Sequence, residues 1–195
     1  MIEHTEEQKE LTEKLKILDE NIKIQWRRTG VVSLIKGLIE IPITKDIDES
    51  VRHFLIEYSA LFGIKRDLSD LKFTKKAEGI KIIHVTYHQI YEEIPVLNAF
   101  ISIHIKTKAK IVIVKSTYHP HPYIGLDTKA IQNVGLSKEK AIEIAHEYLK
   151  AETRLKSESV ADVAILPVKD QFYLAWEVNG TALLENTAET AWSDG

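Results

Sequence analysis

The chain has 195 residues, with 26 Lys and Arg against 29 Asp and Glu, giving a net charge of −3. This balance argues against a nucleic-acid-binding protein, because neutralising phosphates requires a concentrated basic surface. The chain contains no cysteine, which excludes disulfides, thiol catalysis and zinc sites built from cysteine. No stretch approaches the ~18–20 apolar residues that cross a bilayer, so we expect no membrane span.

The first residues, MIEHTEEQKE, are acidic and polar, the reverse of the basic and then apolar order of a signal peptide. The protein is therefore either not secreted or has lost its signal. Residues 5–26 carry Leu, Ile and finally Trp26 at three- and four-residue spacing, which predicts an amphipathic helix. We expect this helix to cover its own domain; docking on a partner is the alternative.

Residues 31–43 are apolar and β-branched and predict one or two short strands. A second helix follows, with Asp46 as its N-cap and Glu49 placed as in a capping box. Gly63 is placed to end this helix, because glycine readily adopts the left-handed backbone that helix ends use.

From residue 71 to residue 118 the hydrophobic period changes to two, which predicts an antiparallel meander with one buried and one wetter face. The first strand places Ile83, Val85, Tyr87 and Tyr91 on one face and His84, Thr86 and His88 on the other. A turn at Glu92–Pro95 leads into a second strand that ends near Lys106, and a third strand covers Ile111–Tyr118.

Residues 119–135 contain several turn formers and are interpreted as a linker. Ser137 begins a further helix, and residues 160–168 and 171–178 predict a hairpin. The inward face of that helix is expected to contain Ala141, Ile144, Ala145, Tyr148 and Leu149. Because the order of helix and then sheet occurs twice, we expect an α+β fold of two small helix-plus-antiparallel-sheet units with an N-terminal helix.

Several of these segments resemble the propeptide domain of fungalysin and thermolysin. They are FLIEYSALFGI at 54–64, DLSDLKF at 67–73 and VTYHQIYEEIPVLNAFISIHI at 85–105, preceded by WRRTGVVSLIKGL at 26–38. The third is the most specific, because Gln89 stands two residues before Tyr91 and Pro95 opens the next apolar strand. Members of this family usually carry small residues at the tight turns where this chain has Glu93 and Asn98.

The remainder of the chain resembles a PepSY domain, the usual companion of that propeptide domain. LSKEKAIEIAHEYL at 136–149 is similar to its helix, and YLAWEVN at 173–179 is similar to its Leu-Ala-Trp strand. The two resemblances imply cystatin-like and PepSY-like units, at 26–125 and 126–195, after an amphipathic helix at 1–25. The chain ends where a complete PepSY domain would continue, so either the final strand diverges or the sequence is a segment of a longer protein.

The resemblance implies a chaperone and inhibitor of a thermolysin-like zinc metalloprotease, acting in cis or in trans, outside the cell or in its envelope. The His-Glu-x-x-His motif, a Gly-rich phosphate loop and a serine nucleophile elbow are all missing from the sequence. We therefore expect no catalytic residue, no cofactor and no enzyme. The alternative is a stand-alone extracellular or envelope interaction module with no protease partner. Exposed strand edges would also allow a homodimer.

Candidate partner contacts are chosen among the aromatic residues, because a few buried aromatic anchors usually dominate the affinity of an interface. The candidates are Tyr87, Gln89, Tyr91, Tyr118 and Tyr123. For Gln89 and Tyr91 the alternative is structural: both could secure the turn at Pro95 by hydrogen bonds and packing.

The eight histidines raise the question of a metal site. His84 and His88 share a strand face, but four residues of strand span ~13 Å, too far for one ion. His88 with His104 across the sheet, and His119 with His121 in a loop, are geometrically open pairs. Because histidines on a polar face are more often structural than ligating, no metal site is predicted.

Overall fold

The computed structural model describes residues 4–41, 46–106, 110–120, 136–148, 154–155, 159–169, 171–179 and 182–183. Two compact units divide the chain, Met1–Ile124 and Gly125–Gly195. Helices combine with antiparallel strands in both, so the α+β class predicted from the sequence is confirmed. Within the described residues, no helix is both long and apolar enough to cross a bilayer.

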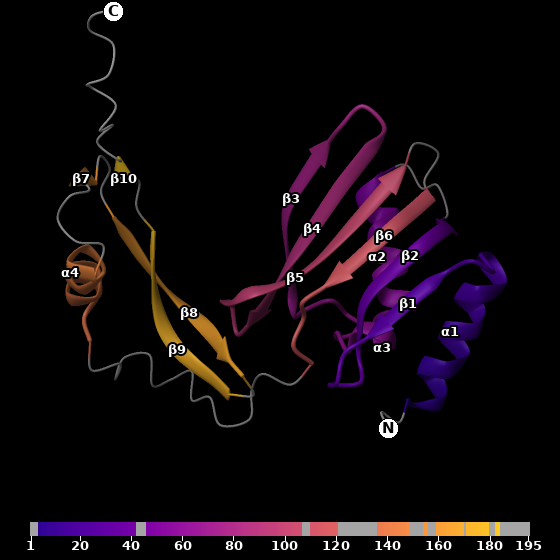
Figure 1. Cartoon of the computed structure of the whole chain (residues 1–195), viewed down its shortest axis with the longest axis horizontal. Coiled ribbons are helices and arrows are strands. Elements are labelled where there is room, and N and C mark those ends of the chain that lie inside the picture. Colours follow the sequence, from indigo (N-terminus) through magenta and orange to yellow (C-terminus); the bar gives the residue numbers. More distant parts are fainter. Residues whose placement is uncertain are drawn as a thin grey trace, which may run out of the picture. The chain divides into compact units, whose positions relative to one another are not determined.

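The first unit contains an antiparallel sheet in the order β1-β2-β6-β5-β4-β3 (Figure 1). Its elements are α1 (Glu6–Leu18), β1 (Lys23–Trp26), β2 (Val32–Glu40), α2 (Ile47–Glu57), α3 (Ser59–Phe62), β3 (Leu71–Glu78), β4 (Ile82–Tyr91), β5 (Ile94–Lys106) and β6 (Lys110–Ser116). Strands β4, β5 and β6 are the three strands of the predicted meander, and β3 adds a fourth that was not predicted separately; each strand pairs with the next. Strand β2 then pairs with β6 and places the N-terminal hairpin beside the last strand of the meander.

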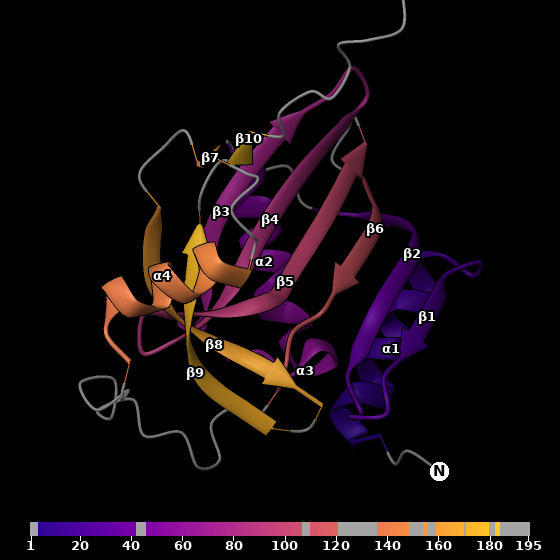
Figure 2. The same cartoon turned by 60° about the vertical axis from the view of Figure 1, so that its left-hand side comes forward.

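Helices α1, α2 and α3 lie on the same face of this sheet (Figures 1 and 2). The core between the two layers joins Leu15, Leu55 and Phe62 from the helices to alternate strand residues such as Val85 and Ile103, all fully buried. Alternate residues are buried because successive strand side chains point to opposite faces. The burial of Leu15 confirms that the N-terminal helix packs on its own unit.

Helix α1 is shorter than predicted. It begins with a capping box between Thr5 and Gln8 and ends at Leu18 rather than near Trp26. Asp19 ends it because its carboxylate accepts hydrogen bonds from the N–H groups of Asn21, at 2.9 Å, and Leu38, at 2.7 Å. The apolar residues that follow alternate along β1, which pairs with β2. The helical spacing of apolar residues over 5–26 therefore corresponds to a helix, a turn and a strand.

The second predicted helix is present but interrupted. Asp46 caps α2 by accepting the N–H of Asp48 at 3.1 Å. The helix ends at Tyr58, after which the short α3 closes at Gly63 with a φ of 71°. Gly63 therefore has the left-handed C-cap role that the sequence predicted.

The second unit contains α4 (Lys138–Tyr148), β7 (Arg154–Leu155), β8 (Val160–Val168), β9 (Gln171–Asn179) and β10 (Ala182–Leu183). Strands β8 and β9 form the predicted hairpin, in register from Val160 opposite Asn179 to Val168 opposite Gln171. The indole N–H of Trp176 donates to the carbonyl of Leu136 at 3.0 Å. This bond joins Leu136, two residues before α4, to β9.

The inward face predicted for α4 is wrong at two of its five residues. Ala141 is buried and Ala145 half-buried, but Ile144 and Tyr148 are exposed, and Leu149 lies outside the described residues. In the described part of this unit α4 packs against β8 and β9.

Candidate functional site

Buried polar side chains tie together the two ends of the β3–β6 meander. Asp70 precedes β3 and Tyr118 follows β6, and both are 2% exposed. The Tyr118 hydroxyl donates to Asp70 Oδ2, which also accepts the N–H of Lys65 at 2.9 Å. The Arg27 guanidinium donates to the carbonyls of Ser116, at 2.8 Å, and Tyr118, at 3.3 Å. Burial lowers the pKa of Arg27. The two carbonyl oxygens accept hydrogen bonds from this partly buried cation.

Gln89 fixes the next residue of the same segment. Its Nε2 donates to the carbonyl of His119 at 2.8 Å, and its Oε1 accepts the N–H of His119 at 2.9 Å. Gln89 is fully buried beside a register shift between β4 and β5. The sequence had associated this amide with the turn at Pro95. The structure assigns these two bonds to His119, because a buried amide that has lost water bonds to the backbone within reach.

The predicted contact residues have different positions in the unit. Tyr87 is 2% exposed, meets Phe73 edge-on at 5.7 Å between ring centroids, and has a pKa raised by burial. Tyr91 is partly exposed at the end of β4, and Tyr123 lies outside the described residues. Tyr87, like Gln89 and Tyr118, therefore has almost no surface with which to touch a partner.

The turn between β4 and β5 has an unusual backbone. Glu92 and Glu93 form a two-residue loop with φ angles of 48° and 66°, and Asn98 has a φ of 59°. Left-handed backbone is unfavourable for residues with a side chain and suits Gly, Asn or Asp at hairpin loops. Glu93 and Asn98 are the positions at which the sequence departs from the small residues of the resembling propeptides.

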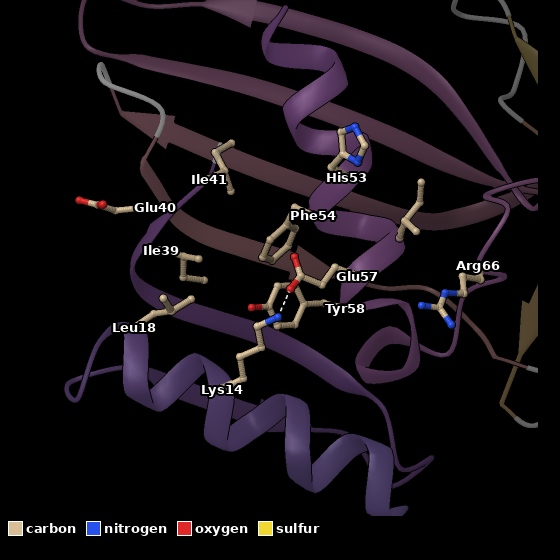
Figure 3. Close-up of a pocket in the computed structure, with 11 residues that line it drawn as sticks. Lys14, Leu18, Ile39, Glu40, Ile41, His53, Phe54, Glu57, Tyr58 and Arg66 are labelled. Carbon is tan, nitrogen blue, oxygen red and sulfur yellow. Dashed lines mark hydrogen bonds and ion pairs between the residues drawn. The ribbon is translucent and has the colours of Figure 1, made fainter. Parts of the chain in front are cut away.

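A pocket of about 580 Å³ opens on the helix side, between the end of α1 and α2 (Figure 3). Its apolar wall is formed by Leu18, Ile39, Ile41, Ile56 and the rings of Phe54 and Tyr58. The two rings are 4.8 Å apart between centroids. Its volume lies within the range of about 300–1,000 Å³ that is typical of ligand pockets.

Charged groups surround this pocket. Lys14 of α1 forms an ion pair with Glu57 of α2 across the opening (Figure 3). Burial, followed by the charge of Glu57, raises the pKa of Tyr58 to about 12, so its hydroxyl stays protonated at neutral pH.

The face of the sheet away from the helices is rich in lysine. We call it the lysine face; its lysines, placed by strand register, are Lys23, Lys36, Lys72, Lys75, Lys106, Lys110 and Lys115. Among the described strand positions of this face the acidic residue is Glu40, which pairs with Lys110 at 2.6 Å. Positive charge is therefore concentrated on one face of a chain whose net charge is −3.

Two histidines lie side by side on the lysine face. His84 of β4 is directly opposite His104 of β5, and their rings meet edge-on at 4.4 Å between centroids. His88 is instead opposite Phe100, so the cross-strand pair that the sequence suggested, His88 with His104, is wrong. Burial, then His84, then Lys115 lower the pKa of His104. A four-residue difference in strand register decided which histidines meet.

Neither of the other histidine pairs supplies a described metal site. His121 lies outside the described residues, and within those residues no group of His, Asp and Glu is arranged to hold a metal ion. The ring of His119 has its pKa lowered by burial and by Arg27.

Comparison with known families bears on the meander itself. The model of the family described as Fungalysin/Thermolysin Propeptide Motif matches residues 71–117, which run from the first residue of β3 to the residue after β6. The β3–β6 segment carries a propeptide motif. This match confirms the resemblance drawn from VTYHQIYEEIPVLNAFISIHI. It places Gln89, Tyr91 and Glu93 inside the propeptide motif and Asp70 and Tyr118 just outside its ends.

Solved structures similar to the whole chain were also found. The Bacillus megaterium YpeB C-terminal domain aligns with 93% of this chain and 88% of its own, at 10% identity and a TM-score of 0.42. No curated protein matches the chain.

Sequence reasoning missed Asp70, Arg27 and the lysine face. Asp70 and Arg27 carry no local signal, because their partners are 48 and 91 residues away. The lysine face had a signal: its lysines alternate with the apolar residues of the strands, as side chains of one face must.

Proposed function

We propose that this protein is a non-catalytic, propeptide-like chaperone and inhibitor of a thermolysin-like zinc metalloprotease. The observation that carries the proposal is the match of residues 71–117 to the propeptide motif. We assign residues 26–125 to an FTP-like domain and 126–195 to a PepSY-like domain. Helix α1 functions with the first of these, because Leu15 lies in its core.

The proposed mechanism is mass action by a rigid surface. A chain that binds a folded protease better than its unfolded form stabilises the folded form in proportion to the logarithm of its concentration. The meander suits this task because Asp70, Arg27 and Gln89 hold the segment Ser116–His119 by buried hydrogen bonds. Inhibition follows when the bound chain also covers the substrate cleft.

We propose divided roles for the five candidate contact residues. The buried residues Tyr87, Gln89 and Tyr118 stabilise the sheet. The candidates for direct contact with the protease are Tyr91 and Tyr123. The pocket between α1 and α2 adds a cavity for an apolar side chain of the protease, and such buried anchors dominate interface energies.

The corresponding location is extracellular or in the cell envelope, where thermolysin-like proteases with such propeptides act. The alternative, a stand-alone interaction module in the same location, has the same fold and differs only in its partner. The experiment below separates the two.

The test adds the purified chain to a panel of thermolysin-like proteases and follows hydrolysis of a chromogenic peptide. We expect activity to fall until the chain and protease are equimolar, with a 1:1 complex in size-exclusion chromatography and no cleavage of the chain by mass spectrometry. In a second arm, urea-unfolded protease is diluted with and without the chain, and we expect a higher yield of active enzyme with it.

Heat-unfolded chain is the matched control, because it has the same composition and can only act as a competing substrate. Full protease activity and an unchanged refolding yield in the presence of excess folded chain would favour the interaction module. Chromatography of the chain alone reports whether it forms a homodimer.

A further inference from the structure

The lysine face differs from helix α1 in how its charges are paired. The lysines of α1 have carboxylate partners, as in Lys9 with Glu6 and Lys16 with Glu13. On the lysine face, Lys110 pairs with Glu40, and among the described residues no ion pair joins its other lysines to a carboxylate. These charges are left for an external anion.

Part of the lysine face is hollow. A depression of about 370 Å³ is bordered by Lys23, Lys36 and Lys106 and floored by Leu38, Val112 and Ile113. Two adjacent bulges form it: β2 has an extra residue between Lys36 and Ile39, and β6 has Val112 as an extra residue opposite β5. Bulges bend a strand and redirect its side chains, which explains a depression in an otherwise even sheet.

Like charges meet at the rim of this depression. Lys23 and Lys36 are directly opposite each other on β1 and β2, an arrangement that destabilises a sheet. Asp19 borders the depression as well, but its two carboxylate oxygens accept the N–H groups of Asn21 and Leu38. Each oxygen of this carboxylate therefore has a backbone donor, and among the described residues no ion pair joins it to a lysine.

We propose that this depression binds an acidic segment of another polypeptide, with two or three carboxylates on the lysines and an apolar side chain on the floor. The apolar floor between cations matches an alternation of acidic and apolar residues. Nucleic acid fits less well: the border has no arginine for bidentate phosphate or base contacts and no aromatic ring on which a base could stack. The inference is independent of the proposed protease partner.

The test measures binding of a fluorescein-labelled peptide of about ten residues, alternating Glu or Asp with Leu, by fluorescence anisotropy with the full chain. We expect binding that weakens steeply between roughly 20 and 150 mM NaCl, because salt screens exposed charges. The triple variant Lys23→Gln, Lys36→Gln, Lys106→Gln should bind at least about tenfold more weakly, since each lost ion contact lowers affinity.

The matched control is the triple variant Lys9→Gln, Lys16→Gln, Lys140→Gln, which removes the same charge from helix lysines that have carboxylate partners. We expect its affinity for the peptide to stay within about twofold of the parent chain. An equal loss of peptide affinity in both variants would show that the peptide is attracted to the positive charge of the chain in general, and would overturn the proposal. So would an unchanged affinity in the first variant.

Two further probes address other anions. A single-stranded oligothymidine of similar charge and vesicles of phosphatidylcholine with phosphatidylglycerol should bind more weakly than the peptide. Tighter binding of either, or no detectable peptide binding at about 20 mM NaCl, overturns the inference. Thermal unfolding of the single variant Lys36→Gln is a separate check. Because the substitution removes the repulsion between Lys23 and Lys36, its melting temperature should equal or exceed that of the parent chain. Weaker peptide binding by this variant then reflects the lost charge and not unfolding.

Discussion

Asp70 and Tyr118, which flank the two ends of the β3–β6 meander, are joined by a buried hydrogen bond from the tyrosine hydroxyl to the Asp70 carboxylate. The bond joins the residue before β3 to the segment after β6, although β3 and β6 are not neighbours in the sheet. The second oxygen of this carboxylate, Oδ1, is buried and has no hydrogen-bond partner among the described residues. The Tyr118 hydroxyl, together with the N–H of Lys65, therefore stabilises the buried carboxylate of Asp70.

Tyr118→Phe should destabilise the protein by about 1–3 kcal/mol, because removing one partner leaves a buried acceptor unsatisfied. Urea unfolding followed by circular dichroism measures the change. Tyr148→Phe is the matched control: Tyr148 is 87% exposed, and its change should stay within about 0.5 kcal/mol. Equal stabilities of the two variants would contradict the structural role of this bond.

Glu93→Gly should stabilise the hairpin β4–β5. Glu93 has a φ of 66°, which costs a residue with a side chain about 1–2 kcal/mol and glycine nothing. Part of this gain is offset by the greater freedom of glycine in the unfolded chain, so we expect a net gain of about 0.5–1 kcal/mol. Thermal and urea unfolding measure it. Glu49→Gly, in the first turn of α2, should lower stability instead, and a loss in both variants would refute the turn geometry.

Gly37→Ala should destabilise the protein by about 1–3 kcal/mol through overpacking. A Cβ atom at this position would lie 2.8 Å from Ile22 Cγ1 and 2.9 Å from Asp19 Oδ2. Because the carboxylate of Asp19 also holds the N–H of Leu38, the methyl group would disturb both the end of α1 and the bulge of β2. The double variant Gly37→Ala, Ile22→Ala should recover part of the loss. If the double variant loses as much stability as the two single variants together, the clash is not with Ile22.

Stability should fall as the pH drops through the titration range of histidine. The pKa values of His104 and His119 are both lowered from 6.5, mainly by burial. Below that pH the unfolded chain therefore binds more protons than the folded one, and the free energy of unfolding decreases. His84 and Lys115 near His104, and Arg27 near His119, act in the same direction.

Urea midpoints measured between about pH 8 and pH 5.5 test this expectation. The double variant His104→Gln, His119→Gln should show a shallower decline than the parent chain. An increase in stability on acidification, or the same slope in both proteins, would contradict it.

Sequence periodicity predicted much of the fold because it reports directly on burial. The alternation from Ile83 to Ile105 could only be a half-buried strand pair, and the cap at Asp46 and the break at Gly63 are set by local backbone chemistry. The family resemblance within 71–117 was likewise readable from residue order alone. Where two periods overlapped, as in residues 5–26, the sequence could not show that Asp19 ends the helix, since one of its partners, Leu38, lies 19 residues away.

The sequence by itself determined the class of the fold, the meander and the propeptide motif, because hydrophobic spacing and turn chemistry act over a few residues. Only the tertiary structure decided that Gln89 and Tyr118 are buried, that His84 rather than His88 meets His104, and that lysines of five strands share one face. These relationships depend on strand register, which is set by packing and by bulges between residues far apart in the chain.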